Sequence, residues 1–140
     1  MPAGYSGTPL AKKLGLKDGT TALFYNLPDY YWDLFIEIPK NIITLTRVNE
    51  GVKVDFIHIF CTSIKDLLTV VPVYKAALKK NGMLWVSWPK GSSGILTDLK
   101  RDFIRSYVIE LGLVDVKVAA VDENWSGLKF VYRVSERKYL

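Results

Sequence analysis

The sequence predicts an α/β fold: a single three-layer domain with a mostly parallel sheet of about six strands and a C-terminal antiparallel hairpin. The chain has 140 residues, 49% of them hydrophobic and 24% charged, which suits one compact domain. Strand-like β-branched runs alternate with helical apolar periodicity, which is typical of parallel sheets covered by helices. We expect one domain over residues 1–140, with residues 1–19 forming an N-terminal arm and a short helix.

Residues typical of helix ends flank the predicted short N-terminal helix. Thr8 can cap free N–H groups, Pro9 suits the first helical position, and Gly15 suits a left-handed stop. Leu10 and Leu14 lie four residues apart, so we expect both to face the body of the protein.

The first half of the sheet is predicted as strands at 20–26, 41–48 and 52–61. Asp29 can cap a short helix over 30–38 between the first two strands. The third strand is apolar on both faces, as a central parallel strand should be.

The second half begins with a helix that opens in a capping box of Ser63 and Asp66. Pro72 should kink this helix, and Asn81-Gly82 should stop it before a strand at 83–88. A further helix, expected soon after Gly94, carries an apolar stripe that runs to Leu111. Strands at 114–121 and 128–134 follow, joined by a turn short enough for an antiparallel hairpin.

Composition restricts the class of protein. One cysteine, Cys61, allows no internal disulfide and no metal cluster. The start of the chain lacks the pattern of a signal peptide, and no apolar run is long enough to span a membrane, so we expect a cytoplasmic location. The net charge is +5, but basic residues are scattered, which argues against nucleic-acid binding.

The second half resembles the end of a Rossmann-like methyltransferase fold. A helix ending in Leu78-Lys79-Lys80-Asn81-Gly82 leads to a strand at 83–87, and the sheet closes with an antiparallel hairpin. The resemblance covers residues 52–134 and implies a truncated methyltransferase fold.

The whole chain is also similar to a small bacterial family known only as a domain of unknown function. Three stretches carry this resemblance: GYSGTPLAKKLG at 4–15, LWVSWPK at 84–90, and LVDVK at 113–117 continuing to DENWSGLK at 122–129. It implies a bacterial origin and a fold, and no activity.

The turn after the first strand argues against a methyltransferase or dehydrogenase cofactor. Such enzymes need a glycine-rich turn there, whereas no glycine occurs between Gly19 and Gly51. Bulky Leu27 and rigid Pro28 occupy the turn. Glu50, after the second strand, could hold a ribose or be a turn residue. The sequence therefore predicts no cofactor.

The loop at 88–98 is one candidate ligand site at the carboxyl ends of the strands. Its glycines permit close backbone approach, its serines offer hydroxyl groups, and its lysine supplies a cation, so the predicted ligand-binding residues are Lys90, Gly91, Ser92, Ser93 and Gly94. The following helix could present free N–H groups to an anion, although Asp98 competes for them. A purely structural loop is the alternative.

The hairpin loop at 122–127 is the other candidate, with Asp122 and Trp125 as predicted ligand-binding residues. Its acidic and asparagine residues are also ordinary turn chemistry. A Cys–His catalytic pair is excluded, because His58 and Cys61 lie three residues apart on one strand and point to opposite faces.

These patterns favour a small cytoplasmic binding module that is neither a conventional methyltransferase nor a dehydrogenase. Its partner would be a small anionic ligand or another protein, and it would be a monomer or homodimer. The alternative is an enzyme acting on a phosphate- or nucleotide-containing small molecule, with Lys90 as a clamp and Asp122 or Glu123 as a base.

Overall fold

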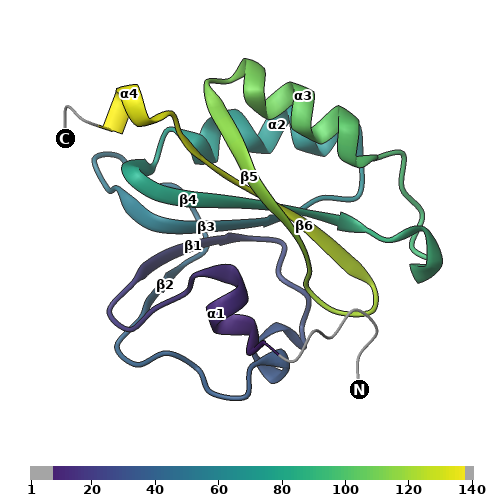
Figure 1. Cartoon of the computed structure of the whole chain (residues 1–140), viewed down its shortest axis with the longest axis horizontal. Helices are drawn as coiled ribbons and strands as arrows, with labels where there is room; N and C mark the ends of the chain where they lie inside the picture. Colours follow the sequence, from purple (N-terminus) through teal and green to yellow (C-terminus); the bar gives the residue numbers. More distant parts are fainter. Residues whose placement is uncertain (1–7, 138–140) are drawn as a thin grey trace.

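A computed structural model describes residues 8–137 (Figure 1). The predicted arm at 1–7 lies outside the described residues. The sheet has six strands in the order β2-β1-β3-β4-β6-β5. Neighbouring strands from β2 to β4 pair in parallel, and β6 pairs antiparallel with both β4 and β5. The strands are β1 (Thr21–Tyr25), β2 (Ile43–Leu45), β3 (Val54–Phe60), β4 (Leu78–Pro89), β5 (Leu113–Ala120) and β6 (Trp125–Tyr132). The predicted fold class is confirmed.

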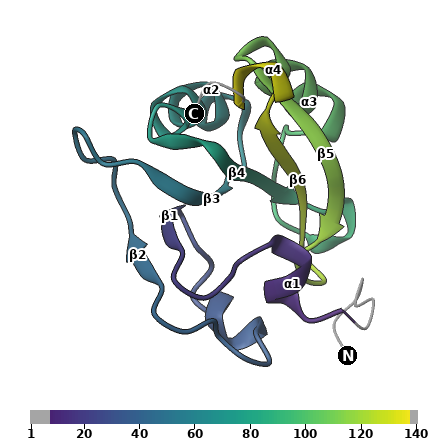
Figure 2. The same ribbon diagram turned by 60° about the vertical axis from the view of Figure 1, so that its left-hand side comes forward.

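Helices cover both faces of this sheet. One face carries α2 (Ile64–Lys75) and α3 (Arg101–Glu110), whereas the other carries α1 (Leu10–Leu14) and the 3-10 helix η1 (Tyr31–Leu34) (Figures 1 and 2). A second 3-10 turn, η2 (Gly91–Ser93), and a last turn, α4 (Val134–Arg137), complete the described chain. No helix within residues 8–137 is long and apolar enough to cross a membrane.

Each face has its own apolar core. Ile57, Ile59 and Leu84 are buried under α2 and α3, and Phe56 and Trp85 are buried on the α1 side. Trp88 belongs to the first core, so Trp85 and Trp88 lie on opposite faces of β4. Burying one large apolar side chain contributes roughly 1.5–3 kcal/mol, so the two cores fix the positions of the strand ends.

The N-terminal helix matches its prediction except at its first residue. Leu10 and Leu14 are buried, and Gly15 ends the helix with φ 81°. The residue before the helix is Pro9, with ψ 141° and no side-chain cap, so the prediction that Thr8 caps the helix is wrong. An extended ψ leaves Pro9 outside the helix and moves its start by one residue.

Helix α2 begins as predicted and ends five residues early. The Ser63 hydroxyl accepts a hydrogen bond from the Asp66 N–H at 3.1 Å. The helix stops at Lys75 because Leu78 already pairs with Val54 in the sheet. The predicted stop at 81–82 therefore lies inside β4, where a side chain at Gly82 would come within 2.9 Å of the Asp55 carbonyl oxygen.

Two other helices are shorter than predicted. The helix expected at 30–38 is the 3-10 turn η1 alone, and Asp29 does not cap it, since the preceding residue is Tyr30 with no side-chain cap. The helix expected soon after Gly94 begins only at Arg101. The intervening chain is held in irregular conformation by side-chain hydrogen bonds of Thr97 and Asp98.

Candidate functional site

The order of the strands places a topological switch point between β1 and β3. The chain leaves β1 toward β2 on one side, then crosses back to β3 on the other. Open α/β sheets bind ligands outside the carboxyl ends of their strands at such a point. The residues that follow β1, β2 and β3 are therefore the first to consider.

Asn26 makes the turn that follows β1. Its φ is 57°, in the left-handed region that asparagine tolerates better than most residues. The side-chain amide donates a hydrogen bond to the Phe60 carbonyl oxygen at 3.3 Å, which ties the end of β1 to the end of β3. The absence of glycine from this turn therefore does not exclude the sharp reversal that glycine would provide.

A hollow of about 370 Å³ opens beside this turn, at the carboxyl ends of β1 and β2. We call it the switch-point hollow, and its lining residues are Phe24, Tyr25, Asn26, Leu27, Thr46 and Tyr74. Its volume falls within the range of about 300–1,000 Å³ common for small-molecule sites. The hollow combines aromatic walls with a few polar groups, as such sites usually do.

The aromatic wall is fixed by hydrogen bonds. The Tyr25 hydroxyl donates to an Asp66 carboxylate oxygen at 2.8 Å, and the Tyr74 hydroxyl donates to the Thr46 carbonyl oxygen at 3.3 Å. The two tyrosine rings meet edge to face with centroids 5.7 Å apart. The hydrogen bond to Asp66, followed by burial, raises the pKa of Tyr25 to about 12, so Tyr25 stays a neutral donor.

The residues considered from the sequence as a thiol nucleophile and a ribose ligand, Cys61 and Glu50, do not line this hollow. Burial and then the charge of Asp66 raise the pKa of the Cys61 thiol to about 12, so Cys61 is a neutral thiol in the core and no thiolate nucleophile. Glu50 is exposed, lies five residues beyond the end of β2, and does not line the hollow.

The loop after β4 lies at the same edge of the sheet. The Lys90 N–H donates to the Asn124 carbonyl oxygen at 2.8 Å, so the two loops singled out from the sequence are in contact. Gly91 and Ser92 are exposed, and the Ser93 hydroxyl accepts from the Ile95 N–H at 3.1 Å. Gly94 has φ 78°, so its glycine is required by the backbone turn.

Two side chains after Gly94 form hydrogen bonds to the backbone around the start of α2. Thr97 donates its hydroxyl hydrogen to the Thr62 carbonyl oxygen at 2.6 Å. Asp98 accepts a hydrogen bond from the Ile64 N–H at 2.8 Å, at the first residue of α2. The expectation that Asp98 competes for the N–H groups of the following helix is therefore wrong, because α3 begins only at Arg101 and the Asp98 carboxylate accepts from the first N–H group of α2.

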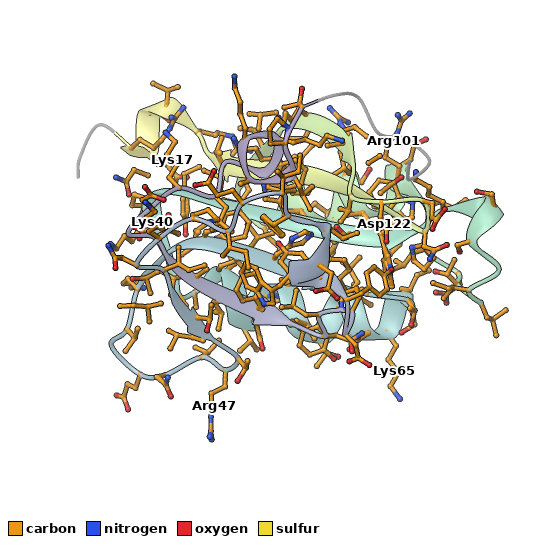
Figure 3. All side chains as sticks on the ribbon, turned by 90° about the horizontal axis from the view of Figure 1, so that it is seen from below. Lys17, Lys40, Arg47, Lys65, Arg101 and Asp122 are labelled. Carbon is orange, nitrogen blue, oxygen red and sulfur yellow. The ribbon has the colours of Figure 1, made fainter. Side chains whose placement is uncertain are left out.

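The hairpin residues face inward. Asp122, labelled in Figure 3, is 5% exposed, and one carboxylate oxygen accepts from the N–H groups of Asn124 and Trp125, both at 2.8 Å. The Trp125 indole packs edge to face on Phe60 with ring centroids 5.0 Å apart. These contacts bring Asp122 and Trp125 to the carboxyl edge and bury both side chains there.

A polar network lies in the core between the halves of the sheet. His58 is fully buried, with Nδ1 3.0 Å from the Tyr31 hydroxyl and Nε2 2.7 Å from the Ser87 hydroxyl. Burial lowers the pKa of His58 to about 3, so the ring is neutral. Cys61 lies in the core of the opposite face, which confirms that the two residues form no catalytic pair.

None of the six lining residues of the switch-point hollow was predicted from the sequence as a ligand-binding residue. Asn26 carried a usable signal, because asparagine directly after a strand is a known substitute for glycine at a left-handed turn. Tyr74 carried none, since its helical spacing marks only the buried face of α2.

Comparison with known proteins gave structural matches alone. No family model matches the chain, and no curated protein matches it. The resemblance to a family of unknown function is therefore not confirmed.

The solved structures similar to this chain include proteins named as methyltransferases and a fibrillarin. A SAM-dependent methyltransferase from Aquifex aeolicus is 15% identical, with a TM-score of 0.61 and 86% of both chains covered. A putative type 11 methyltransferase from Sulfolobus solfataricus is 18% identical, with a TM-score of 0.63 and 91% of both chains covered. Fibrillarin from Aeropyrum pernix, with natively bound S-adenosyl-L-methionine, is 15% identical, with a TM-score of 0.54, 87% of this chain and 73% of that chain covered.

At these identities the matches show the fold, which is that of methyltransferases. They overturn the prediction of a binding module that is not a conventional methyltransferase, because structural neighbours named as methyltransferases or a methylase share its fold. The prediction was based on the need for glycine in this turn, and the turn instead places Asn26 at a left-handed φ of 57°.

Proposed function

We propose that the protein binds S-adenosylmethionine in the switch-point hollow and transfers its methyl group to an acceptor. One observation carries the proposal: a left-handed residue directly after β1, Asn26, borders a hollow at the carboxyl ends of β1 and β2. The methyltransferase fold supports it, because this edge of the sheet is where open α/β folds bind their ligands.

The residues of the hollow suit an adenosyl group. The edge-to-face rings of Tyr25 and Tyr74 offer an aromatic wall for a purine, since aromatic pairs favour such packing. Asn26 and Thr46 are exposed and offer an amide oxygen and a hydroxyl for a sugar. These four residues would therefore hold the nucleoside part of the cofactor.

When bound, S-adenosylmethionine would supply an electrophilic methyl group on its sulfonium sulfur: the acceptor would form a bond to the methyl carbon, the carbon–sulfur bond would break, and S-adenosylhomocysteine would leave as a thioether. In this proposal Tyr25 stays protonated and keeps its hydrogen bond to Asp66. The chain's own contribution is to bind and orient the cofactor at the open edge of the sheet.

The experiment is a thermal-unfolding and calorimetric titration with S-adenosylhomocysteine. At ~100 times the dissociation constant, a ligand stabilises the native state by about 2.7 kcal/mol, so we expect the melting temperature to rise by about 8 °C. Thr46→Trp should abolish this rise, because the exposed side chain of residue 46 lines the hollow and an indole would fill it.

Thr69→Trp is the matched control, since it adds the same indole on the exposed surface of α2. It should bind S-adenosylhomocysteine as the wild-type protein does. Equal binding by Thr46→Trp would show that the ligand lies elsewhere, and no binding by the wild-type protein would rule out the proposal. Transfer of a labelled methyl group to fractions of a cell extract would then identify the acceptor.

The loop residues predicted from the sequence remain part of the proposal. They would border an acceptor beside the cofactor, because they lie at the same carboxyl edge: Lys90, Gly91, Ser92, Ser93, Gly94, Asp122 and Trp125. A cytoplasmic location and a monomeric or homodimeric state are likewise proposed.

A further inference from the structure

A second hollow lies on the other face of the sheet, between α1 and the carboxyl half of β5. Its volume is about 460 Å³, and we call it the lysine groove. Figures 1 and 2 both show α1 beside the β5–β6 hairpin. The lining residues are Thr8, Lys12, Lys13, Lys117, Val118, Ala119 and Ala120. The groove shares no residue with the switch-point hollow.

Positive charge is concentrated around this groove. Burial, followed by the charges of Lys90 and Lys117, lowers the pKa of Lys13. Burial, followed by the charges of Lys117 and Lys17, lowers the pKa of Lys129. The ammonium groups therefore lie close enough to repel one another, in a part of the surface where burial already disfavours charge.

The carboxylates within the described chain do not neutralise this cluster. The ion pairs among residues 8–137 involve Lys79, Arg101 and Arg105, and none involves a lysine of the groove. Asp115, on the same strand as Lys117, pairs with Arg105 at 3.0 Å. Asp122 accepts backbone N–H groups instead.

One lysine is already positioned. The Lys13 ammonium donates a hydrogen bond to the Ala120 carbonyl oxygen at 3.0 Å, which holds its charge at the wall of the groove. Two of its three donor hydrogens remain for a ligand. Lys12 and Lys117 are exposed on the same walls, so three cations of the lining can converge on one group.

We propose that the lysine groove binds phosphate groups. Several ammonium groups without carboxylate partners suit a multiply charged anion, and lysine is a common phosphate ligand. The phosphates could belong to a free phosphorylated molecule or to a nucleic acid, and the two probes below separate these sources. Lys90, whose charge acts on Lys13, directly follows the last residue of β4, so a ligand that also contacted Lys90 would extend toward the carboxyl edge. The inference does not depend on the proposed methyltransferase function.

The test compares tripolyphosphate with a fluorescently labelled RNA of ten nucleotides, each titrated into the full chain. Tripolyphosphate should raise the melting temperature of the wild-type protein, and the double variant Lys13→Gln, Lys117→Gln should lose that rise. If three phosphate groups of the single-stranded RNA contact the groove, the affinity for the RNA should fall about 20-fold between 50 and 200 mM salt.

The matched control is Lys65→Gln, Lys100→Gln, which removes the same charge from exposed positions away from the groove. Lys65 extends outward from α2 (Figure 3). The control should keep the response to each probe that the wild-type protein binds. A response to tripolyphosphate alone identifies a small phosphorylated ligand, and a response to RNA identifies a nucleic acid. No response of the wild-type protein to either probe, or an equal loss in both double variants, would overturn the inference.

Discussion

In the loops that follow β4 and β5, carboxylates accept backbone N–H groups of the protein, whereas the polar side chains that follow β1 and β2 border a hollow. Asp122 and Asp98 each accept N–H groups of the protein. Asn26 and Thr46 are exposed at the edge of a hollow. The difference teaches that a loop rich in polar residues can be structural, and that a sparse turn can border a ligand site.

These two halves of the edge are connected through His58 on β3. Its ring bonds Tyr31, which follows β1, and Ser87 on β4. Both bonds use a neutral imidazole, since each nitrogen has one hydroxyl partner within the described chain. The connection between the halves should therefore depend on pH.

Acid should produce the largest loss of stability. The pKa of His58 is about 3 in the folded protein and about 6.5 when unfolded, so the unfolded state binds the proton more tightly. The contribution of neutral His58 to the free energy of unfolding is then fully present above pH ~6.5. It falls by about 1.4 kcal/mol per pH unit below that value, so about 3 kcal/mol is lost by pH 4. Urea unfolding at several pH values measures this loss.

Because the chain has one histidine, its proton NMR signal reports this residue alone. The signal of the folded protein should not titrate between pH 8 and 5. A midpoint near 6.5 in the folded protein would show that His58 is solvated, and the connection between the halves would then not depend on burial.

Asp122→Ala should have the next largest effect. It leaves two backbone N–H groups without their acceptor, one of them at buried Trp125, and should lower the free energy of unfolding by about 2 kcal/mol. Asp122→Asn keeps an acceptor oxygen and should lose less. Glu123→Ala, at the exposed neighbour, should change stability by less than about 0.5 kcal/mol. Denaturant unfolding compares the three variants.

If Asp122→Ala were as stable as Glu123→Ala, the carboxylate would have no structural role, and the contrast between the two halves would be lost. Binding of S-adenosylhomocysteine separates the roles further. If the role of Asp122 is structural, Asp122→Ala should be less stable but should still bind S-adenosylhomocysteine, because Asp122 does not line the switch-point hollow.

Local signals in the sequence predicted much of the fold. The capping box at Ser63, the stop at Gly15 and the apolar run of β3 each depend on neighbours in the chain, so they could be predicted without tertiary structure. The start of β4 could not. It depends on the pairing of Leu78 with Val54 and on the ion pair between Lys79 and Asp55 at 2.9 Å, which join residues far apart in sequence.

The site was harder to predict than the fold for the same reason. The switch-point hollow forms where Tyr74 of α2 meets the end of β1, and no local pattern marks that meeting. The lysine groove likewise brings Lys13 of α1 to Lys117 of β5. The scattered basic residues of the sequence become a cluster only after folding.

Among the residues given a structural role, the smallest expected effect concerns Asn26. Asn26→Ala places a residue with a poor left-handed preference at φ 57° and removes the bond to Phe60, so it should cost about 1–2 kcal/mol. Asn26→Gly removes the same bond but tolerates this backbone, so it should cost less stability, and it should weaken the binding of S-adenosylhomocysteine because it lacks the amide oxygen proposed to hold the sugar. Denaturant unfolding and calorimetry compare the two. If the two variants were equally stable, the left-handed φ of residue 26 would not limit which residue can occupy the turn, and this turn would not differ in that respect from the loops after β4 and β5.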